Sequence, residues 1–403
     1  MVMQEGVGWH PDARPGPFFA MLCLRRTVGT STSDLKDVMT GLWEIVAGLK
    51  RGQVPGLPAE PAYAGGLLCT VGYGPRLFAE PGAEGAGAAE LRECAFDRPQ
   101  PGGGGAVLPG AGLQYASDAT DNGADADVAV QLVADQQAAV TRAVVVLHRH
   151  LQEQGSVRDQ GAAVNVSGAW LGYRREDRRS WLGFHDGVDN VNGPERYNTV
   201  TVGPAADDRW LRGGTYLAFL RLELDLDVWR ALMPWEQELL VGREKATGVP
   251  LDPAGHETTA ASLAADTTTV FARANLPIRV PRPVDLDNPS GLGGSHVQRT
   301  RRHPGLRIYR QGYEFLDIAG SPPRLQPGLN FVSFQCSPNR IVEMLRTPSW
   351  LGAHSFAGAR PRSSGDHLLA VPGLLRARAA GIFAAPAADE GRLPGSAMLA
   401  AWG

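Results

Sequence analysis

Both halves of the sequence repeat one succession, in which an apolar strand-like run precedes an amphipathic helical segment. In the first half, FFAMLCLRR (18–26) has the apolar character of a buried strand. LKDVMTGLWEIVAGL (35–49) then places its apolar residues at helical spacing, and Ser33 is expected to cap this helix. A second strand (67–71) follows and runs into a glycine turn. These elements predict a β-α-β unit.

A second unit follows in the same half, and the C-terminal half repeats the pattern. ADVAVQLVA (126–134) predicts a strand and DQQAAVTRAVVVLHRHL a helix. In the C-terminal half, strands are expected at 215–226 and 329–336. The helices expected after them are DVWRALMPWEQELLVGR and NRIVEMLRTPSW. Four strands with two helices on one face form a split β-α-β, or ferredoxin-like, arrangement.

The predicted fold class is therefore α+β, with two ferredoxin-like domains that each contain an antiparallel sheet. The expected boundaries are 15–175 for the N-terminal domain, 176–206 for a linker, 207–385 for the C-terminal domain and 386–403 for a flexible tail. A turn between two domains is a common position for a ligand site.

Charge and cysteine content narrow the functional classes. The net charge is −3 and no polybasic run occurs, which argues against nucleic-acid and membrane-surface partners. Four cysteines occur without a CxxC pair, as is typical of reduced thiols. There is no signal-peptide pattern and no apolar run of the roughly 20 residues that span a bilayer. A cytoplasmic location is expected.

One turn carries a charge in an apolar setting. In SWLGFHDGVDN (180–190), Asp186 stands between two glycines and close to a tryptophan, a leucine and a phenylalanine. A carboxylate is costly to bury unless it is paired or takes part in chemistry. The alternative is an ordinary turn-forming aspartate, which the turn alone does not exclude.

Several blocks of the chain, in order, resemble one family. GFHDG (183–187) resembles the GxxDG motif of dye-decolourising (DyP-type) haem peroxidases. Further blocks resemble that family in sequence order: TVGYGPRLF, RGGTYLAFLRLEL, GREKATGVPL, SHV, HPGLRIYRQGYEF and GLNFVSFQCSP. They extend over most of the chain, and the resemblance implies a double ferredoxin-like fold with haem in the C-terminal domain.

The resemblance also implies roles for individual residues. His296 stands where the family has its proximal haem ligand, which is also the metal ligand, and Asp186 and Arg310 stand where it has its catalytic distal pair. Further haem-lining positions are implied for Gly187, Val188, Asp189, Arg301, Arg302, His303, Leu329 and Phe331. The implied cofactor is haem b (iron protoporphyrin IX), and the arginines near 301 are expected to pair with its propionates.

The implied activity is reduction of hydrogen peroxide with oxidation of an aromatic or dye-like reductant. One carboxylate in hydrogen-bond reach of peroxide can take a proton from one oxygen and return it to the other. Tyr309 and Tyr313 flank Arg310 and serve either as strand packing or as electron carriers. Two other functions stay open: a haem-dependent biosynthetic oxidase acting on one metabolite, and a haem-binding or haem-delivery protein. The family often self-associates, so a homo-oligomer is compatible with the resemblance.

The sequence departs from the family at two places near the motif. VDNVNGP replaces a run that commonly resembles Thr-Ala-Asn-Pro, and His185 stands where a basic residue is frequent. An acidic partner for the proximal histidine is not identified. Five further histidines are most simply surface or packing residues: His148, His150, His256, His354 and His367.

Overall fold

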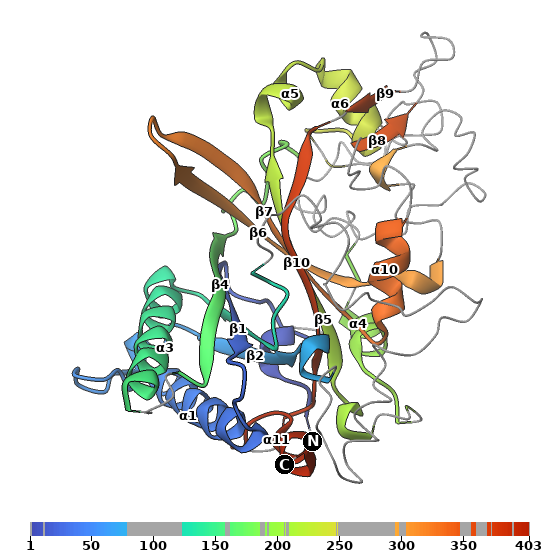
Figure 1. Ribbon diagram of the computed structural model, residues 1–403. Helices are drawn as coiled ribbons and strands as arrows, with labels where there is room; N and C mark the ends of the chain where they lie inside the picture. Colours follow the sequence, from blue (N-terminus) through green and yellow to red (C-terminus); the bar gives the residue numbers. More distant parts are fainter. Residues whose placement is uncertain are drawn as a thin grey trace.

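The strands of the two halves form one closed barrel (Figure 1). The structure is a computed structural model that describes residues 2–10, 13–78, 123–157, 162–185, 190–191, 193–204, 206, 209–246, 248, 295–297, 304–346, 356–359, 369–371, 373–388 and 391–402. The strand order around the barrel is β1-β3-β2-β10-β5-β7-β6-β4, and every neighbouring pair is antiparallel. The barrel strands are β1 (Phe18–Arg26), β2 (Leu68–Tyr73), β3 (Val128–Ala134), β4 (Val164–Tyr173), β5 (Thr215–Leu224), β6 (Tyr309–Ala319), β7 (Arg324–Gln335) and β10 (Leu375–Ala385).

The prediction of two ferredoxin-like domains with separate antiparallel sheets is wrong. The strands of the N-terminal half join those of the C-terminal half at two seams, where Tyr73 pairs with Ala384 and Tyr173 pairs with Glu314. Two separate sheets would each leave edge strands with unpaired backbone groups, and closure into a barrel removes these edges. The apolar pattern of a strand shows which face is buried but not which strand lies beside it.

A residue near the start of the chain secures one seam. The buried Gln4 side chain donates from Nε2 to the carbonyls of Val71 and Pro386, at 2.8 Å each. Its Oε1 accepts from the backbone N–H of Val71 at 2.7 Å. The β2–β10 pairing is short, with Tyr73 opposite Ala384. The Gln4 amide therefore adds hydrogen bonds between β2 and the residue that follows β10.

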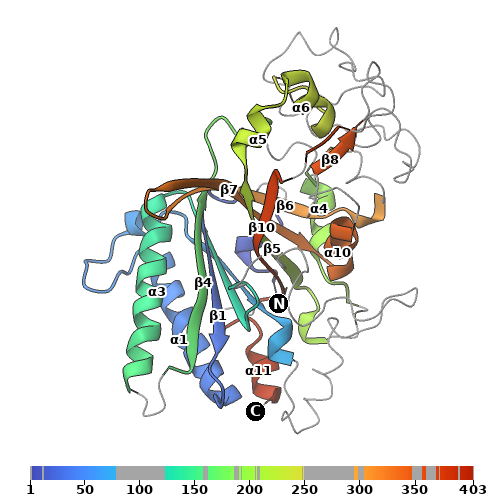
Figure 2. The ribbon, with the colours of Figure 1, turned by 45° about the horizontal axis from the view of Figure 1, so that its top comes forward.

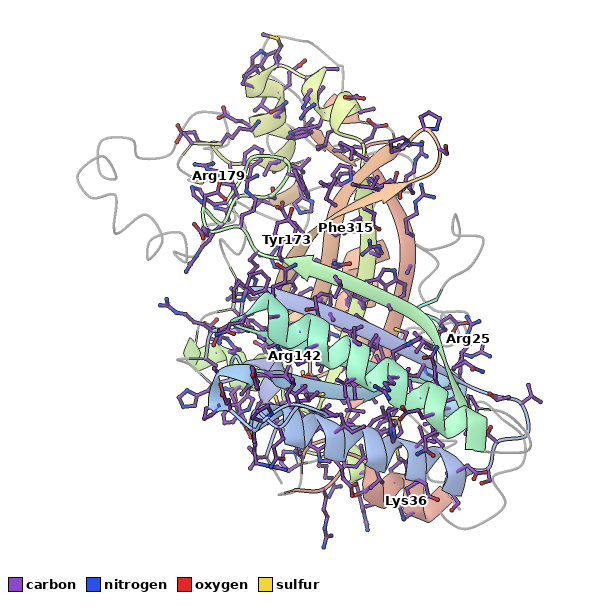
Figure 3. The ribbon with its side chains drawn as sticks, turned by 90° about the vertical axis from the view of Figure 1, so that its left-hand side faces the viewer. Arg25, Lys36, Arg142, Tyr173, Arg179 and Phe315 are labelled. Carbon is purple, nitrogen blue, oxygen red and sulfur yellow. The ribbon has the colours of Figure 1, made fainter. Side chains whose placement is uncertain are left out.

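Helices cover the outer face of the N-terminal half of the barrel (Figure 3). α1 (Thr32–Lys50) begins after Ser31, which with Asp34 forms a capping box, so the cap lies two residues before the predicted Ser33. α3 (Gln137–Val157) lies beside α1, with Lys36 and Arg142 marking the two helices in Figure 3. None of the described helices is both long and apolar enough to cross a membrane.

The predicted flexible tail contains an ordered helix. α11 (Ser396–Trp402) packs against α1, and its Met398 and Leu399 are buried. The Tyr73 hydroxyl donates to the carbonyl of Pro394 at 2.6 Å, just before this helix. Apolar burial therefore holds a C-terminal segment that was expected to be flexible because it is terminal.

The helices of the C-terminal half lie on its outer face and beyond one end of the barrel (Figure 2). α4 contacts β6 and β7, and α10 contacts β5 and β7. α5 and α6 lie beyond the end of β5, and α6 contacts the small β8–β9 sheet. The bounds are α4 (Gly193–Val200), α5 (Leu226–Arg230), α6 (Pro234–Val241), α10 (Pro338–Arg346), β8 (Phe356–Ala359) and β9 (Leu369–Val371).

Candidate functional site

The two faces of β6 carry different chemistry. Tyr309 and Tyr313 belong to the cluster that fills the barrel interior together with residues such as Phe19 and Phe219. Alternation along a strand therefore places Arg310 on the outer face. On the neighbouring strand β7, Arg310 lies opposite Ser333, and Phe331 and Leu329 follow at alternate positions on that face. The fold thus gathers three predicted site residues on one surface: Arg310, Leu329 and Phe331.

The two tyrosines beside Arg310 face away from this surface. Tyr313 is fully buried and stacks on Phe19 with a centroid distance of 4.6 Å. Burial raises the pKa of Tyr313 to about 12. Tyr309 is buried and stacks on Phe334. Both side chains pack the barrel interior, so their closeness to Arg310 in sequence does not place them on its face.

Asn190, just after the motif, is fastened to β6 at Arg310. Its Nδ2 donates to the carbonyl of Arg310 at 2.7 Å, and its Oδ1 accepts from the backbone N–H of Arg310 at 3.0 Å. The predicted residues Asp186, Gly187, Val188 and Asp189 lie outside the described residues, as do Arg301, Arg302 and His303. Among the described residues that flank this stretch, His185 pairs with Arg179 and Asn190 is hydrogen-bonded to Arg310.

The entry side of the turn is fixed by hydrogen bonds to its backbone. The Arg179 guanidinium donates to the carbonyls of Gly183 and Lys245 at 2.7 Å each, and to that of Ala246 at 2.8 Å. The Trp229 indole donates to the carbonyl of Leu182 at 3.1 Å. Arg179 therefore ties the GxxDG segment to the GREKATG segment, two blocks that lie far apart in sequence.

The backbone conformation explains why the first residue of the motif is a glycine. Gly183 has φ +87°, in the left-handed region that favours glycine, and a Cβ there would lie 3.2 Å from Cε of Lys245. The Lys245 ammonium lies 5.4 Å from the Phe184 ring centroid and 5.7 Å from that of Trp229. Its pKa is lowered, chiefly by burial.

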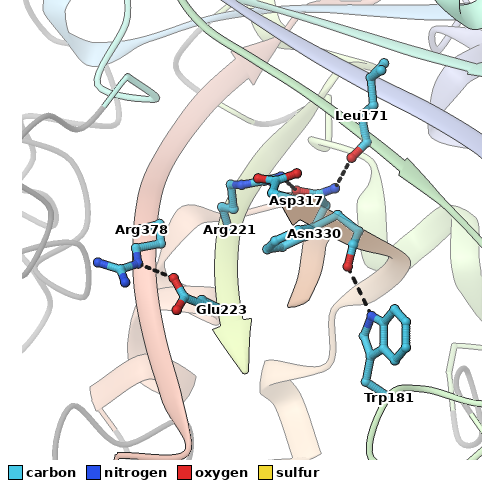
Figure 4. A network of polar contacts seen from close by, with 8 residues as sticks. Leu171, Trp181, Arg221, Glu223, Asp317, Asn330 and Arg378 are labelled. Atoms are coloured by element: carbon cyan, nitrogen blue, oxygen red, sulfur yellow. Dashed lines mark hydrogen bonds and ion pairs between the residues drawn. The ribbon is translucent and has the colours of Figure 1, made fainter. Parts of the chain in front are cut away.

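Trp181 connects the motif to the end of the barrel. Its indole N–H donates to the carbonyl of Phe315 on β6 at 3.1 Å (Figure 4). Phe315 and Tyr173 lie near each other where β4 meets β6, and Arg179 lies beyond them (Figure 3). The motif is thus anchored to β6 on both sides, at Phe315 before the turn and at Arg310 after it.

A small apolar cluster brings the histidine segment to the motif. Phe184, Trp229 and Leu240 are buried together, and Val297 packs against this cluster. The neighbouring His296 is partly buried and the preceding Ser295 is fully buried. The predicted iron ligand therefore lies on a segment that contacts both α6 and the motif.

The end of α6 packs against the segment that carries His296. Gly242 caps this helix with φ +88°, and a Cβ there would lie 2.5 Å from Oγ of Ser295. The next residue, Arg243, is buried and donates from Nη1 to the carbonyl of Gly248 at 2.8 Å. Burial, and secondarily the positive charge of Arg310, lower the pKa of Arg243 to about 9. Arg243 is thus a buried guanidinium that directly follows the glycine on which Ser295 packs.

Comparison with known families decides the relationship. Residues 177–390 match the family model described as "Dyp-type peroxidase, C-terminal", more than half of the 403 residues. The chain belongs to the Dyp-type peroxidase family. Haem is the cofactor of this family, and a DypB variant from Rhodococcus jostii RHA1 was solved in complex with heme.

Curated relatives match over limited lengths. A dye-decolorizing peroxidase of Mycobacterium tuberculosis is 34% identical over 96 residues, 24% of this chain and 28% of the relative. A deferrochelatase of Escherichia coli K12 is 26% identical over 213 residues, 52% of this chain and 47% of the relative. The chain therefore spans less than half of the length of these curated relatives.

Solved structures share the fold over nearly the whole chain. A DyP-type peroxidase from Streptomyces coelicolor has a TM-score of 0.67 at 19% identity, covering 99% of this chain and 95% of that one. The DypB variant has a TM-score of 0.58 at 18% identity, with 96% of each chain covered. At this identity the likeness establishes the fold.

Sequence reasoning did not identify Asn190, Arg179 or Arg243. The signal for Asn190 is its place directly after the turn, in the stretch that departs from the family's usual run. Arg243 lies within the recognised GREKATG block, but its burial and its charged neighbour become visible only in three dimensions.

Proposed function

We propose that this chain is a haem-dependent peroxidase that reduces hydrogen peroxide and oxidises an aromatic or dye-like reductant. The observation that carries the proposal is the double hydrogen bond between Asn190 and the backbone of Arg310. It joins the end of the GxxDG turn to the strand position of the distal arginine. These bonds join positions that are 120 residues apart in sequence, whereas an ordinary surface turn forms its hydrogen bonds locally.

The donor set fits a haem. His296 offers one partly buried imidazole, and a neutral imidazole nitrogen is a common axial ligand of haem iron. Phe331 and Leu329 offer apolar surface on the same face as Arg310. Two guanidinium groups, Arg243 and Arg310, offer positive charge to a cofactor that carries two carboxylates. When bound, the haem supplies the redox chemistry that cleaves the peroxide O–O bond.

The residues of the chain handle the proton and the charge. Asp186 takes a proton from one peroxide oxygen and delivers it to the other, which requires the carboxylate to be ionised at the start. The positive charge of Arg310 favours that ionised form and stabilises negative charge that develops on oxygen. Asn190 holds the backbone of Arg310 through two hydrogen bonds and thereby helps to position this arginine. The haem-lining roles of Gly187, Val188, Asp189, Arg301, Arg302 and His303 stay predictions.

The test is an absorption spectrum of the purified chain before and after hydrogen peroxide, followed by addition of an oxidisable dye. The proposal expects a Soret band, a rapid spectral change on peroxide addition and its reversal as the dye is oxidised. A haem-loaded chain whose spectrum does not respond to peroxide contradicts peroxidase activity. A chain that responds to peroxide but ignores dyes favours an oxidase dedicated to one metabolite.

A second candidate follows from the relatives named deferrochelatase, whose match covers 52% of this chain. The name denotes removal of iron from a chelate, and we propose haem as the chelate for this chain. It is tested by incubating the chain with haem under reducing conditions and recording porphyrin fluorescence. Metal-free porphyrin in excess of a His296→Ala control supports this candidate, and its absence opposes it.

A cytoplasmic location stays a prediction from the sequence.

A further inference from the structure

Two polar atoms inside the barrel are buried without a hydrogen-bond partner among the described residues: Oγ1 of Thr70 and Oε1 of Gln131. Both residues are fully buried. On β3, Gln131 alternates with Ala129 and Val133, which belong to the interior cluster. On β2, Thr70 follows two residues after Leu68, which packs against the same cluster. A buried polar atom without a partner is costly, so each of these two atoms calls for an explanation.

The two side chains are neighbours across one ladder. Thr70 lies opposite Gln131 in the antiparallel register of β2 and β3. Residues directly opposite each other in such a pair have Cβ atoms about 4.5–5.5 Å apart. Two polar side chains that face the same interior at this separation can share one small molecule that hydrogen-bonds to both.

A chain of hydrogen bonds fixes which end of the Gln131 amide lacks a partner. The carbonyl of Val7 can only accept, and Nε2 of Gln311 donates to it at 2.9 Å. Oε1 of Gln311 therefore faces Gln131 and accepts from its Nε2 at 3.1 Å. The Tyr313 hydroxyl lies 3.4 Å from the same Gln311 oxygen. The oxygen of Gln131 thus points away from this chain, and it requires a donor.

The N-terminal segment closes this position. A Cβ on Gly6 would lie 2.4 Å from Oγ1 of Thr70, so the backbone of residue 6 lies directly against that hydroxyl. Gly6 and Val7 are themselves buried. The bonds of Gln4 to Val71 and of Gln311 to Val7 hold the segment in place. A molecule between Thr70 and Gln131 is therefore enclosed by the barrel and this segment.

We propose that Thr70 and Gln131 form a binding site for one internal water molecule. The water donates a hydrogen to Oε1 of Gln131 and accepts the hydrogen of the Thr70 hydroxyl. Internal waters typically make about two to four hydrogen bonds to buried groups that otherwise lack partners. The water completes a polar chain that runs from Gln311 on β6 to Thr70 on β2 through an otherwise largely apolar interior. The site is independent of the proposed function.

The experiment counts internal waters in the full-length haem-free chain. The proteins are wild type, Thr70→Val and the control Thr215→Val, which alters another buried strand threonine whose hydroxyl donates to the Gln335 carbonyl at 3.3 Å. Valine has the branched shape of threonine without the hydroxyl. We expect oxygen-17 magnetic relaxation dispersion to show one long-lived internal water fewer in Thr70→Val and an unchanged number in Thr215→Val.

Urea unfolding adds a test by sign. Loss of the water leaves the Gln131 oxygen without a donor, so we expect the unfolding equilibrium constant of Thr70→Val to rise about tenfold. A hydroxyl that binds nothing costs stability, and its removal would make the variant more stable than the wild type.

The inference is overturned by an unchanged number of waters in Thr70→Val, by a more stable Thr70→Val, or by an equal loss of water in Thr215→Val. If Thr70→Val does not fold, a crystal structure of the wild type decides. Electron density for a water about 2.5–3.0 Å from both oxygens supports the site, and its absence there overturns the inference.

Discussion

Two buried arginines among the described residues of the C-terminal half, equally inaccessible to water, lie in different surroundings. At the end of the barrel, Arg221 is matched by Asp317 and Asn330 (Figure 4). Directly after α6, Arg243 donates to the carbonyl of Gly248. The positive charge of Arg310 contributes to lowering its pKa. Burial lowers the pKa of both guanidinium groups, and at Arg221 the neighbouring carboxylates of Asp317 and Glu223 oppose this shift. The comparison shows that the described residues pair the buried charge at the barrel end, whereas beside α6 they supply one carbonyl to the buried guanidinium.

The largest expected effect concerns catalysis and comes from the aspartate of the GxxDG motif. Asp186→Asn removes the group that we assign to proton transfer, and general acid–base catalysis contributes about 10²–10⁴-fold to a rate. We therefore expect the rate of the peroxide-induced spectral change to fall by that order, with haem content and unfolding midpoint unchanged. Stopped-flow spectroscopy measures the rate. A near-wild-type rate in this variant would show that another group moves the proton.

At the barrel end we expect a substitution to lower the stability of the fold. Arg221→Met breaks the ion pair and leaves the buried Asn330 oxygen without that donor. We expect the free energy of unfolding to fall by about 3 kcal/mol, toward the low end for a broken buried pair because Asp317 is half-exposed. Urea unfolding of the haem-free chain measures this, with Arg149→Met on the exposed surface of α3 as the control. The comparison of the two regions fails if Arg243→Met destabilises the haem-free chain just as strongly, since among the described residues Arg243 donates to one carbonyl and forms no ion pair.

Asn190 should show an intermediate effect that appears in catalysis and not in haem loading. Asn190→Ala removes two hydrogen bonds to the backbone of Arg310, and we expect the peroxide reaction to slow by about tenfold. Asn190→Asp retains the acceptor for the Arg310 N–H and should lose less. Both rates are measured at matched haem content. If Asn190→Ala reacts normally with peroxide but melts earlier, the bond is structural only.

The smallest expected effect is a pH dependence at the motif. The pKa of His185 is lowered, first by burial and then by the charge of Arg179. In the unfolded chain this histidine takes up a proton as the pH falls through about 6.5, while the folded chain resists protonation. Stability is therefore lost toward acid pH, and His185→Gln should lose less. Melting temperatures at neutral and mildly acidic pH measure the difference, and equal acid sensitivity of the two proteins would contradict it.

The sequence predicted local elements more successfully than the connections between them. The strand over 126–134 and the helix after it correspond to β3 and α3, because unbroken apolar runs and helical spacing are local signals. Barrel closure escaped prediction, since each seam depends on the pairing of edge strands that carry no distinctive residues. α11 also escaped it, because its small apolar residues become a helix only through packing on α1.

The same limit applies to the site. Arg310, Leu329 and Phe331 were expected to line one surface, and the register of β6 and β7 places them on one face. The bond between Asn190 and Arg310 joins positions 120 residues apart, which neither spacing nor composition can reveal. The burial of Arg243 likewise arises from tertiary packing, which sets the charge environment of a residue independently of its neighbours in sequence.

The most direct measurement is the Soret absorbance of the purified chain and of its His296→Ala variant, recorded at equal concentration after exposure to hemin. The account predicts a strong band for the wild type and its near-complete loss in the variant, with the far-ultraviolet circular dichroism of the two proteins unchanged. Equal Soret absorbance in both proteins, or no absorbance in either, would contradict a haem held by the segment that packs on α6.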